Sequence, residues 1–129
     1  MLLSISTWIN IILTFCMALL QLSLTLGVPL GEYVLGGTHQ ILPPAKRVLS
    51  GLVCCSFFIA GLSFLQRAGI APTIFAATFA TTYLIIYAMF LASAIVFNGF
   101  ITKSKKEKFW MTPISIIGFI SIVYFLLHT

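Results

Sequence analysis

The stretch PTIFAATFATTYLIIYAMFLASAIVF, residues 72–97, contains no charged side chain and is one of four long apolar stretches in the chain. An α-helix of about 20 apolar residues spans the ~30 Å hydrocarbon core of a bilayer, so this stretch can cross a membrane once. The others are residues 5–26, 47–65 and 112–127. The sequence therefore predicts an all-α membrane protein, in which residues 1–129 form a single integral membrane domain built as an antiparallel bundle of four transmembrane helices.

The composition agrees with this class. Only 7% of the 129 residues are charged and 60% are hydrophobic, which gives a mean hydropathy of +1.15. A water-soluble globule of this composition could not cover its surface with polar side chains. The net charge of +5 would suit a nucleic-acid binder, but its placement next to apolar spans favours a membrane surface, and no nucleic-acid partner is expected.

The basic residues predict the orientation of the chain. All but one of the seven lie in the first and third connections between the predicted helices, and Arg67 alone lies in the second. Connections with an excess of Lys and Arg stay in the cytoplasm. We therefore expect a multi-pass protein of the cell inner (plasma) membrane, with the first and third connections cytoplasmic and both termini outside.

The first connection, GVPLGEYVLGGTHQILPPAKR (residues 27–47), is longer than a tight turn needs. Its four glycines and three prolines predict a specified backbone path, because each restricts or permits particular backbone angles. Its apolar middle, Tyr33 to Leu35, favours a segment that folds back into the bundle or partly re-enters the membrane. The predicted fold therefore includes a long structured first connection.

The first predicted helix carries a polar stripe. At 100° per residue its members project within about 60° of one another. Amide groups facing lipid tails would remain unpaired, so the stripe should face the other helices or a wet cavity. Interhelical hydrogen bonding and a polar-lined ligand or ion route both fit. The stripe consists of Thr7, Asn10, Thr14, Gln21 and Thr25.

Small residues four apart, such as Gly51 and Cys55 or Ala88 and Ala92, allow close helix approach. They favour a compact bundle and also permit a homodimer or a partner membrane protein.

Polar residues of the two cytoplasmic connections form the one candidate binding site. Lys46 and Arg47 open the second helix, where a helix N-terminus and basic side chains can bind a phosphate. The favoured explanation is topology and anchoring to the anionic leaflet, which needs no specific ligand. Glu32 and His39 can form an acid/base pair, or they can satisfy a nearby lysine and a loop carbonyl. The site hypothesis groups these residues with the third connection, as Glu32, His39, Lys46, Arg47, Asn98 and Glu107.

Two motifs carry a resemblance. Residues 29–47 read PLGEYVLGG-x-H-x-x-LPP-x-x-R and residues 98–113 read N-x-x-x-x-K-S-x-x-E-x-x-x-M-T-P. Together they resemble the signature of a group of small four-helix bacterial membrane proteins of unknown function, over the whole chain. The resemblance implies a bacterial inner membrane and no particular activity.

The leading functional expectation is a non-enzymatic binding or accessory protein that engages an anionic lipid headgroup or a partner protein at the cytoplasmic face. One alternative is a small transporter lined by the polar stripe. Another is a membrane enzyme that acts on a lipid-soluble substrate through Glu32 and His39. No catalytic or nucleotide-binding motif and no metal-ligand spacing is present in the sequence, so no catalytic residue, metal or cofactor is expected.

Overall fold

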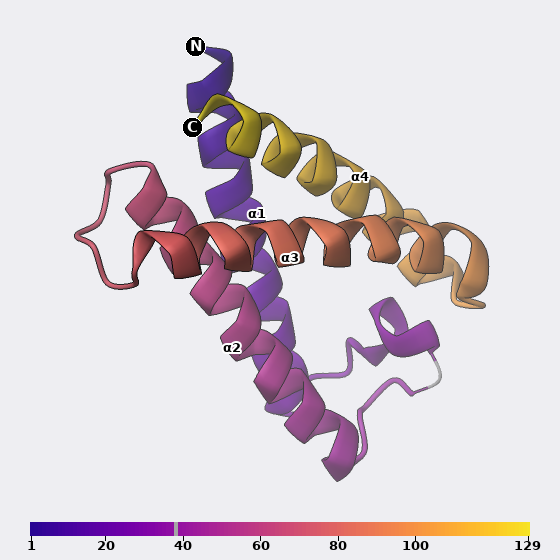
Figure 1. Ribbon diagram of the computed structural model, residues 1–129. Helices are drawn as coiled ribbons and strands as arrows, with labels where there is room; N and C mark the ends of the chain where they lie inside the picture. The colour runs from indigo at the N-terminus through magenta and orange to yellow at the C-terminus, as the bar shows by residue number, and fades with distance from the viewer. Residues whose placement is uncertain (38) are drawn as a thin grey trace.

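The computed structural model describes residues 1–37 and 39–129, without the side chains of Glu32 and Leu35. Four long helices dominate it: α1 (Leu2–Thr25), α2 (Pro44–Arg67), α3 (Ala77–Val96) and α4 (Lys105–His128) (Figure 1). A π-helical turn, η3 (Phe97–Ile101), extends α3, and two short 3-10 turns, η1 (Gly31–Tyr33) and η2 (Leu35–Gly37), lie in the first connection. All four helices are long and apolar enough to cross a membrane. The predicted fold, an antiparallel four-helix membrane protein, is confirmed.

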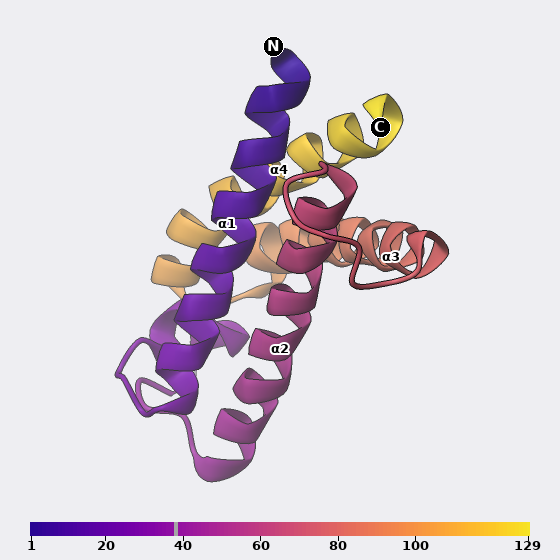
Figure 2. The ribbon, with the colours of Figure 1, turned by 90° about the vertical axis from the view of Figure 1, so that its left-hand side faces the viewer.

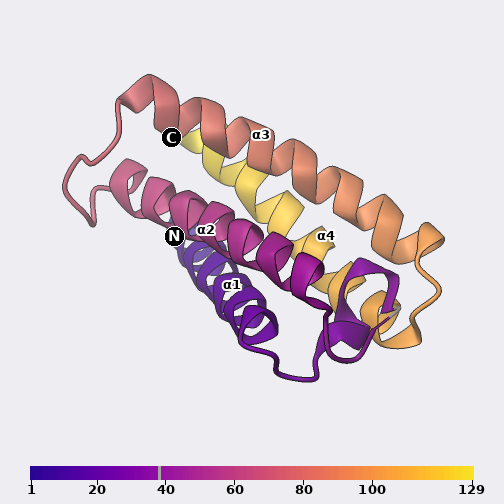
Figure 3. The ribbon, with the colours of Figure 1, turned by 90° about the horizontal axis from the view of Figure 1, so that it is seen from below.

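The helices form two hairpins that lie close together at one end and diverge at the other. Figure 1 shows the α1–α2 hairpin crossing the α3–α4 hairpin obliquely, with the first connection in the wedge between them. Figure 2 shows α1 and α2 side by side, and Figure 3 shows the first and second connections at opposite ends of the bundle. The first connection contacts α4 through η1 and η2.

We call the end where the two hairpins lie close together the closed end, and the end where they diverge the open end. The apolar core fills the closed end and the middle of the bundle. Phe64 of α2 and Phe125 of α4 are fully buried, and their rings meet edge to face with centroids 5.3 Å apart. The side chains on the outside are also apolar; Leu52 and Ile86, for example, are 64% and 60% exposed. A surface of this kind suits hydrocarbon, where the backbone is satisfied within each helix. The remaining core residues are Ile11, Leu84, Ala88, Leu91 and Ile122.

The third helix begins at Ala77 and not at Pro72, where the apolar stretch of the sequence begins. The reason lies in Gln66, at the end of α2. Its side-chain oxygen accepts hydrogen bonds from the backbone N–H groups of Ile74 (2.9 Å) and Phe75 (2.8 Å). These bonds hold the second connection against the end of α2 in a non-helical path.

The fourth helix begins at Lys105, well before the predicted start at Thr112. Ser104 caps it, because its hydroxyl accepts a hydrogen bond from the N–H of Glu107 at 3.2 Å, as serine commonly does at this position. Pro113 then lies inside the helix, where it lacks the N–H that would bond the carbonyl of Phe109. The early start places Glu107 in the first turn of a helix and not in a solvated connection.

The two ends of the bundle differ in charge. All but one of the basic residues lie at the open end, in the third connection and at the starts of α2 and α4. Arg67 lies at the closed end, where its guanidinium donates to the hydroxyls of Thr81 (2.6 Å) and Thr129 (2.8 Å). This arginine joins the end of α2 to the start of α3 and to the C-terminus.

Candidate functional site

A cavity of about 360 Å³ lies between the four helices in the half of the bundle next to the first connection. Small-molecule sites in proteins enclose about 300–1,000 Å³, so this cavity falls at the lower end of that range. Its lining comes from the C-terminal halves of α1 and α3, the N-terminal halves of α2 and α4, and the first connection. Most of the lining is apolar, with polar groups from Gln21, Tyr33, Ser50, Tyr87, Ser93, Asn98, Glu107 and Ser115.

Glu107 supplies the only acidic side chain among the described residues of the lining. It is 2% exposed. One carboxylate oxygen, Oε2, accepts a long hydrogen bond of 3.4 Å from the N–H of Gly36. The other, Oε1, is buried and has no hydrogen-bond partner within the described part of the chain. A buried acceptor without a donor costs about 1–3 kcal/mol, and more when it is charged, so this oxygen is placed where a ligand's donor would satisfy it.

The first turn of α4 sets the position of this carboxylate. Ser104 occupies the cap and Glu107 the third helical position, where the positive end of the helix dipole favours a negative side chain. The hydroxyl of Thr102 accepts from the N–H of Ser104 at 3.2 Å and fixes the approach of the chain. The Ser104 cap therefore places Glu107 in the first turn of α4, and its side chain is buried in the bundle.

Asn98 reaches the same cavity from α3. It lies in the π-helical turn η3 and is 9% exposed. Its amide nitrogen donates to the hydroxyl of Ser115 on α4 at 3.2 Å. A π turn changes the direction of side chains along a helix and is frequent at functional sites. Here it brings a buried amide to the end of the cavity where Ser115 and Glu107 lie.

The first connection closes this end of the cavity. The N–H of Gly31 donates to the carbonyl of Gln40 at 2.8 Å, and a Cβ on Gly31 would collide with the carbonyl oxygen of His39, so only glycine fits there. Gly36 has φ +77°, a conformation that glycine adopts readily, and it directs its N–H toward Glu107. Tyr33 lines the cavity.

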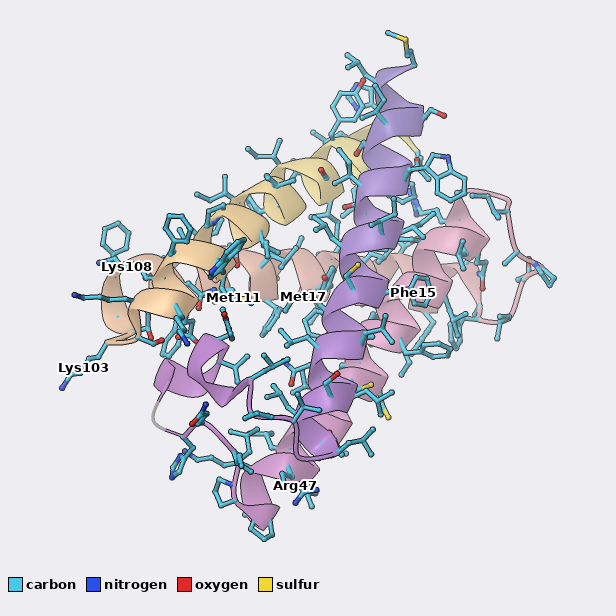
Figure 4. All side chains as sticks on the ribbon, turned by 180° about the vertical axis from the view of Figure 1, so that it is seen from behind. Phe15, Met17, Arg47, Lys103, Lys108 and Met111 are labelled. Atoms are coloured by element: carbon cyan, nitrogen blue, oxygen red, sulfur yellow. The ribbon has the colours of Figure 1, made fainter. Side chains whose placement is uncertain are left out.

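A lysine in the first turn of α4 packs on the first connection. The Nζ of Lys106 lies over the ring of Tyr33, 5.7 Å from its centroid, within cation–π range. Lys103, Lys105 and Lys108 are exposed, and Figure 4 shows Lys103 and Lys108 extending outward from this end of α4. Figure 4 also shows Met17 of α1 and Met111 of α4 beside the space between their helices, and both line the cavity.

The structure separates the predicted site residues into two groups. Asn98 and Glu107 line the cavity. Arg47 instead links two helices, because its Nε donates to the carbonyl of Thr25 at 2.9 Å, at the C-terminal end of α1. Lys46 and His39 form a hydrogen bond between Nζ and Nδ1 at 3.4 Å on the exposed side of the loop. The side chain of Glu32 lies outside the described residues.

The polar stripe of α1 is also divided. The amide of Asn10 donates to the carbonyl of Ser121 on α4 at 3.1 Å, and the Thr14 hydroxyl donates to the carbonyl of Asn10 at 2.5 Å. Thr25 donates to the carbonyl of Gln21 at 2.9 Å. Of these residues only Gln21 lines the cavity. Asn10 thus bonds a neighbouring helix, whereas Thr14 and Thr25 bond carbonyls one turn earlier in α1.

The cavity continues along the surface between α2 and α3. A second hollow of about 240 Å³ lies on this side and shares Val53, Phe57, Tyr87 and Phe90 with the cavity. The cavity lining includes Leu49 and Phe90, which are 45% and 51% exposed, so it opens laterally toward the hydrocarbon. The hydroxyl of Tyr83, which lines the second hollow, donates to the carbonyl of Ser56 at 2.8 Å and bridges the two helices there.

Several cavity residues were not predicted as site residues from the sequence: Tyr33, Ser50, Ser93 and Ser115. The spacing of Ser104 and Glu107, a capping-box pattern, is the signal that could have placed Glu107 on a helix.

The chain matches no protein-family model, no curated protein and no solved structure, so no family is assigned to it, and the resemblance to small bacterial membrane proteins stays a prediction.

Proposed function

We propose that this chain is a non-enzymatic membrane protein that binds one phospholipid molecule, with the lipid's polar end in the cavity and an acyl chain along the groove between α2 and α3. The observation that carries the proposal is the cavity itself, which is apolar over most of its wall and polar where Asn98, Glu107 and Ser115 meet. A ligand with an apolar part and a polar part fits a cavity whose wall has both kinds of surface. Its lateral opening faces the direction from which a lipid would enter.

The exposed lysines at the open end support a phosphate-bearing lipid. Lys103, Lys105 and Lys108 surround the start of α4, and basic residues next to a membrane span attract anionic leaflets by about 1 kcal/mol each. We place this end in the cytoplasm by the positive-inside rule. Trypsin added to sealed vesicles of each orientation checks the placement: cleavage at these lysines is expected only when the cytoplasmic face is outward.

Photo-crosslinking tests the lipid site. A phospholipid that carries a diazirine on one acyl chain is incorporated with the purified protein into nanodiscs and irradiated, and the labelled peptides are identified by mass spectrometry. We expect the labels to concentrate on residues 49–57 and 83–97, which line the groove, over the equally apolar outer face of α4. An even distribution over all exposed apolar residues would contradict the proposal.

A matched pair of variants sharpens this test. Ser93 is exposed and lines the cavity, so Ser93→Phe places a ring in its mouth; Thr82 is exposed on the same helix but lines neither hollow. Labelling of the groove should fall in Ser93→Phe and stay at the wild-type level in Thr82→Phe. Equal labelling in both variants would count against occupation of the cavity.

Transport and catalysis stay alternative predictions. Asn10 and Thr14, two residues of the predicted transport lining, are engaged in helix hydrogen bonds, and His39 is bonded to Lys46 on the loop surface. Solute flux into proteoliposomes and turnover of a lipid extract are the measurements that would raise either alternative above lipid binding.

A further inference from the structure

The unpaired oxygen of Glu107 specifies the chemistry of the head group more closely than the cavity does. We propose that the bound phospholipid carries a primary ammonium group, which donates a hydrogen bond to Oε1 of Glu107. This inference rests on the lipid-binding function proposed above and adds the class of head group. Its starting point is that Oε1 is buried within a 2% exposed residue and has no donor among the described residues.

The free oxygen of Glu107 requires a ligand that donates a hydrogen bond. A carboxylate accepts hydrogen bonds and donates none, so a ligand that fits here must bring an N–H or O–H group. A phosphate or carboxylate end would place two acceptors and two negative charges together, which is unfavourable in a buried site. A quaternary ammonium brings positive charge but no N–H.

The charge of the Glu107 carboxylate favours a cationic donor. Among the described residues, Oε1 of Glu107 has no hydrogen-bond partner, and the described partner of Oε2 is the neutral N–H of Gly36. A buried carboxylate is stable when a cation pairs with it. A ligand hydroxyl would satisfy the free oxygen without balancing its charge, whereas an ammonium does both. Charge-assisted bonds are also roughly twice as strong as neutral ones.

The cavity also offers acceptors for the remaining hydrogens of an ammonium group. A primary ammonium has three N–H donors, and one of them goes to Oε1. Asn98, Ser115 and Tyr33 line the same cavity and carry oxygens that accept such donors. The phosphate of the same head group complements the exposed lysines at this end of the bundle. A zwitterionic aminophospholipid therefore suits both sets of groups.

Competition between lipids of identical acyl chains tests the inference. Phosphatidylethanolamine, phosphatidylcholine and phosphatidylglycerol are mixed at equal mole fraction with the protein in a neutral maltoside detergent, and bound lipid is counted by native mass spectrometry. We expect the ethanolamine lipid to exceed each of the others by about tenfold in the wild type, the effect of one charge-assisted hydrogen bond. In Glu107→Gln, which keeps an acceptor for Gly36, the preference should fall to less than about twofold.

Equal binding of the three lipids by the wild type, or an unchanged preference in Glu107→Gln, would overturn the head-group assignment while leaving the lipid-binding function standing. Absence of any bound lipid would overturn both. A second measurement needs no variant: in the series of N-monomethyl, N,N-dimethyl and N,N,N-trimethyl head groups, binding should weaken with each N–H that is lost and fall most at the trimethyl step, where no donor remains for Oε1. A drop already complete at the first methyl group would indicate selection by size and contradict the inference.

Discussion

Replacing Gly61 by alanine probes the contact between α1 and α2 on which the bundle depends. A Cβ built on Gly61 would lie 2.6 Å from Cζ and 2.9 Å from Cε1 and Cε2 of the Phe15 ring, so the ring has to move away from its edge-to-face partner Phe58. Overpacking of this kind costs about 1–3 kcal/mol, while alanine in a helix gains about 1 kcal/mol over glycine. We therefore expect the free energy of unfolding of Gly61→Ala to be about 0–2 kcal/mol lower than that of the wild type.

A second glycine of the same helix removes the helix-propensity contribution from the comparison. The nearest atoms to a Cβ on Gly51 are 3.6 Å away, on Thr25, which is ordinary van der Waals contact. The free energy of unfolding should therefore be about 1–3 kcal/mol lower for Gly61→Ala than for Gly51→Ala. The assay is unfolding in mixed maltoside and dodecyl sulfate micelles, followed by far-ultraviolet circular dichroism. Equal stability of the two variants, or failure of Phe15→Leu to rescue Gly61→Ala, would refute the packing argument.

Three further predictions concern the loop, the helix link and the cavity. Gly31→Ala should expose the first connection to protease, because its Cβ collides with carbonyl oxygens across the loop; wild-type resistance would contradict this. Arg47→Gln should lower the unfolding free energy by about 1 kcal/mol, because it loses the bond to the Thr25 carbonyl, with Arg47→Lys intermediate; no loss in either would speak against the link. Asn98→Ala and Ser115→Ala should couple in a double-mutant cycle by about 0.6 kcal/mol, the average for membrane hydrogen bonds; additive effects would exclude the bond.

The class of fold could be predicted from the sequence, because four long apolar stretches joined by basic connections are typical of helices that cross a lipid bilayer. It was less informative about where helices begin. Pro72 and Pro113 both suit a first helical turn, yet Gln66 holds the segment after α2 in a non-helical path and Ser104 starts α4 early. Both helix starts are set by side-chain hydrogen bonds, and a proline in the sequence does not show that such a bond will form elsewhere.

The candidate site was predictable in part. Asn98 and Glu107 belonged to the predicted set and line the cavity, because the first and third connections do meet at one end of the bundle. The set also contained Arg47, which binds the Thr25 carbonyl instead. Sequence alone does not distinguish an arginine that faces a ligand from one that caps a neighbouring helix, since the choice depends on where α1 ends in space.

The inward direction of Glu107 was the least predictable feature. A glutamate among four lysines is usually a solvated member of a charged surface, and its burial here depends on the first connection, whose Gly36 N–H reaches it across the wedge between the hairpins. That contact joins segments far apart in the chain, and no local pattern encodes it.

The central claim is that a lipid occupies the cavity between the hairpins. The most direct measurement is native mass spectrometry of the protein taken from its own membrane into maltoside detergent, with no lipid added. We predict one tightly held phospholipid per chain in the wild type and in Thr82→Phe, and its loss in Ser93→Phe. A wild-type chain that emerges without lipid, or a Ser93→Phe chain that retains the same phospholipid, would contradict the claim.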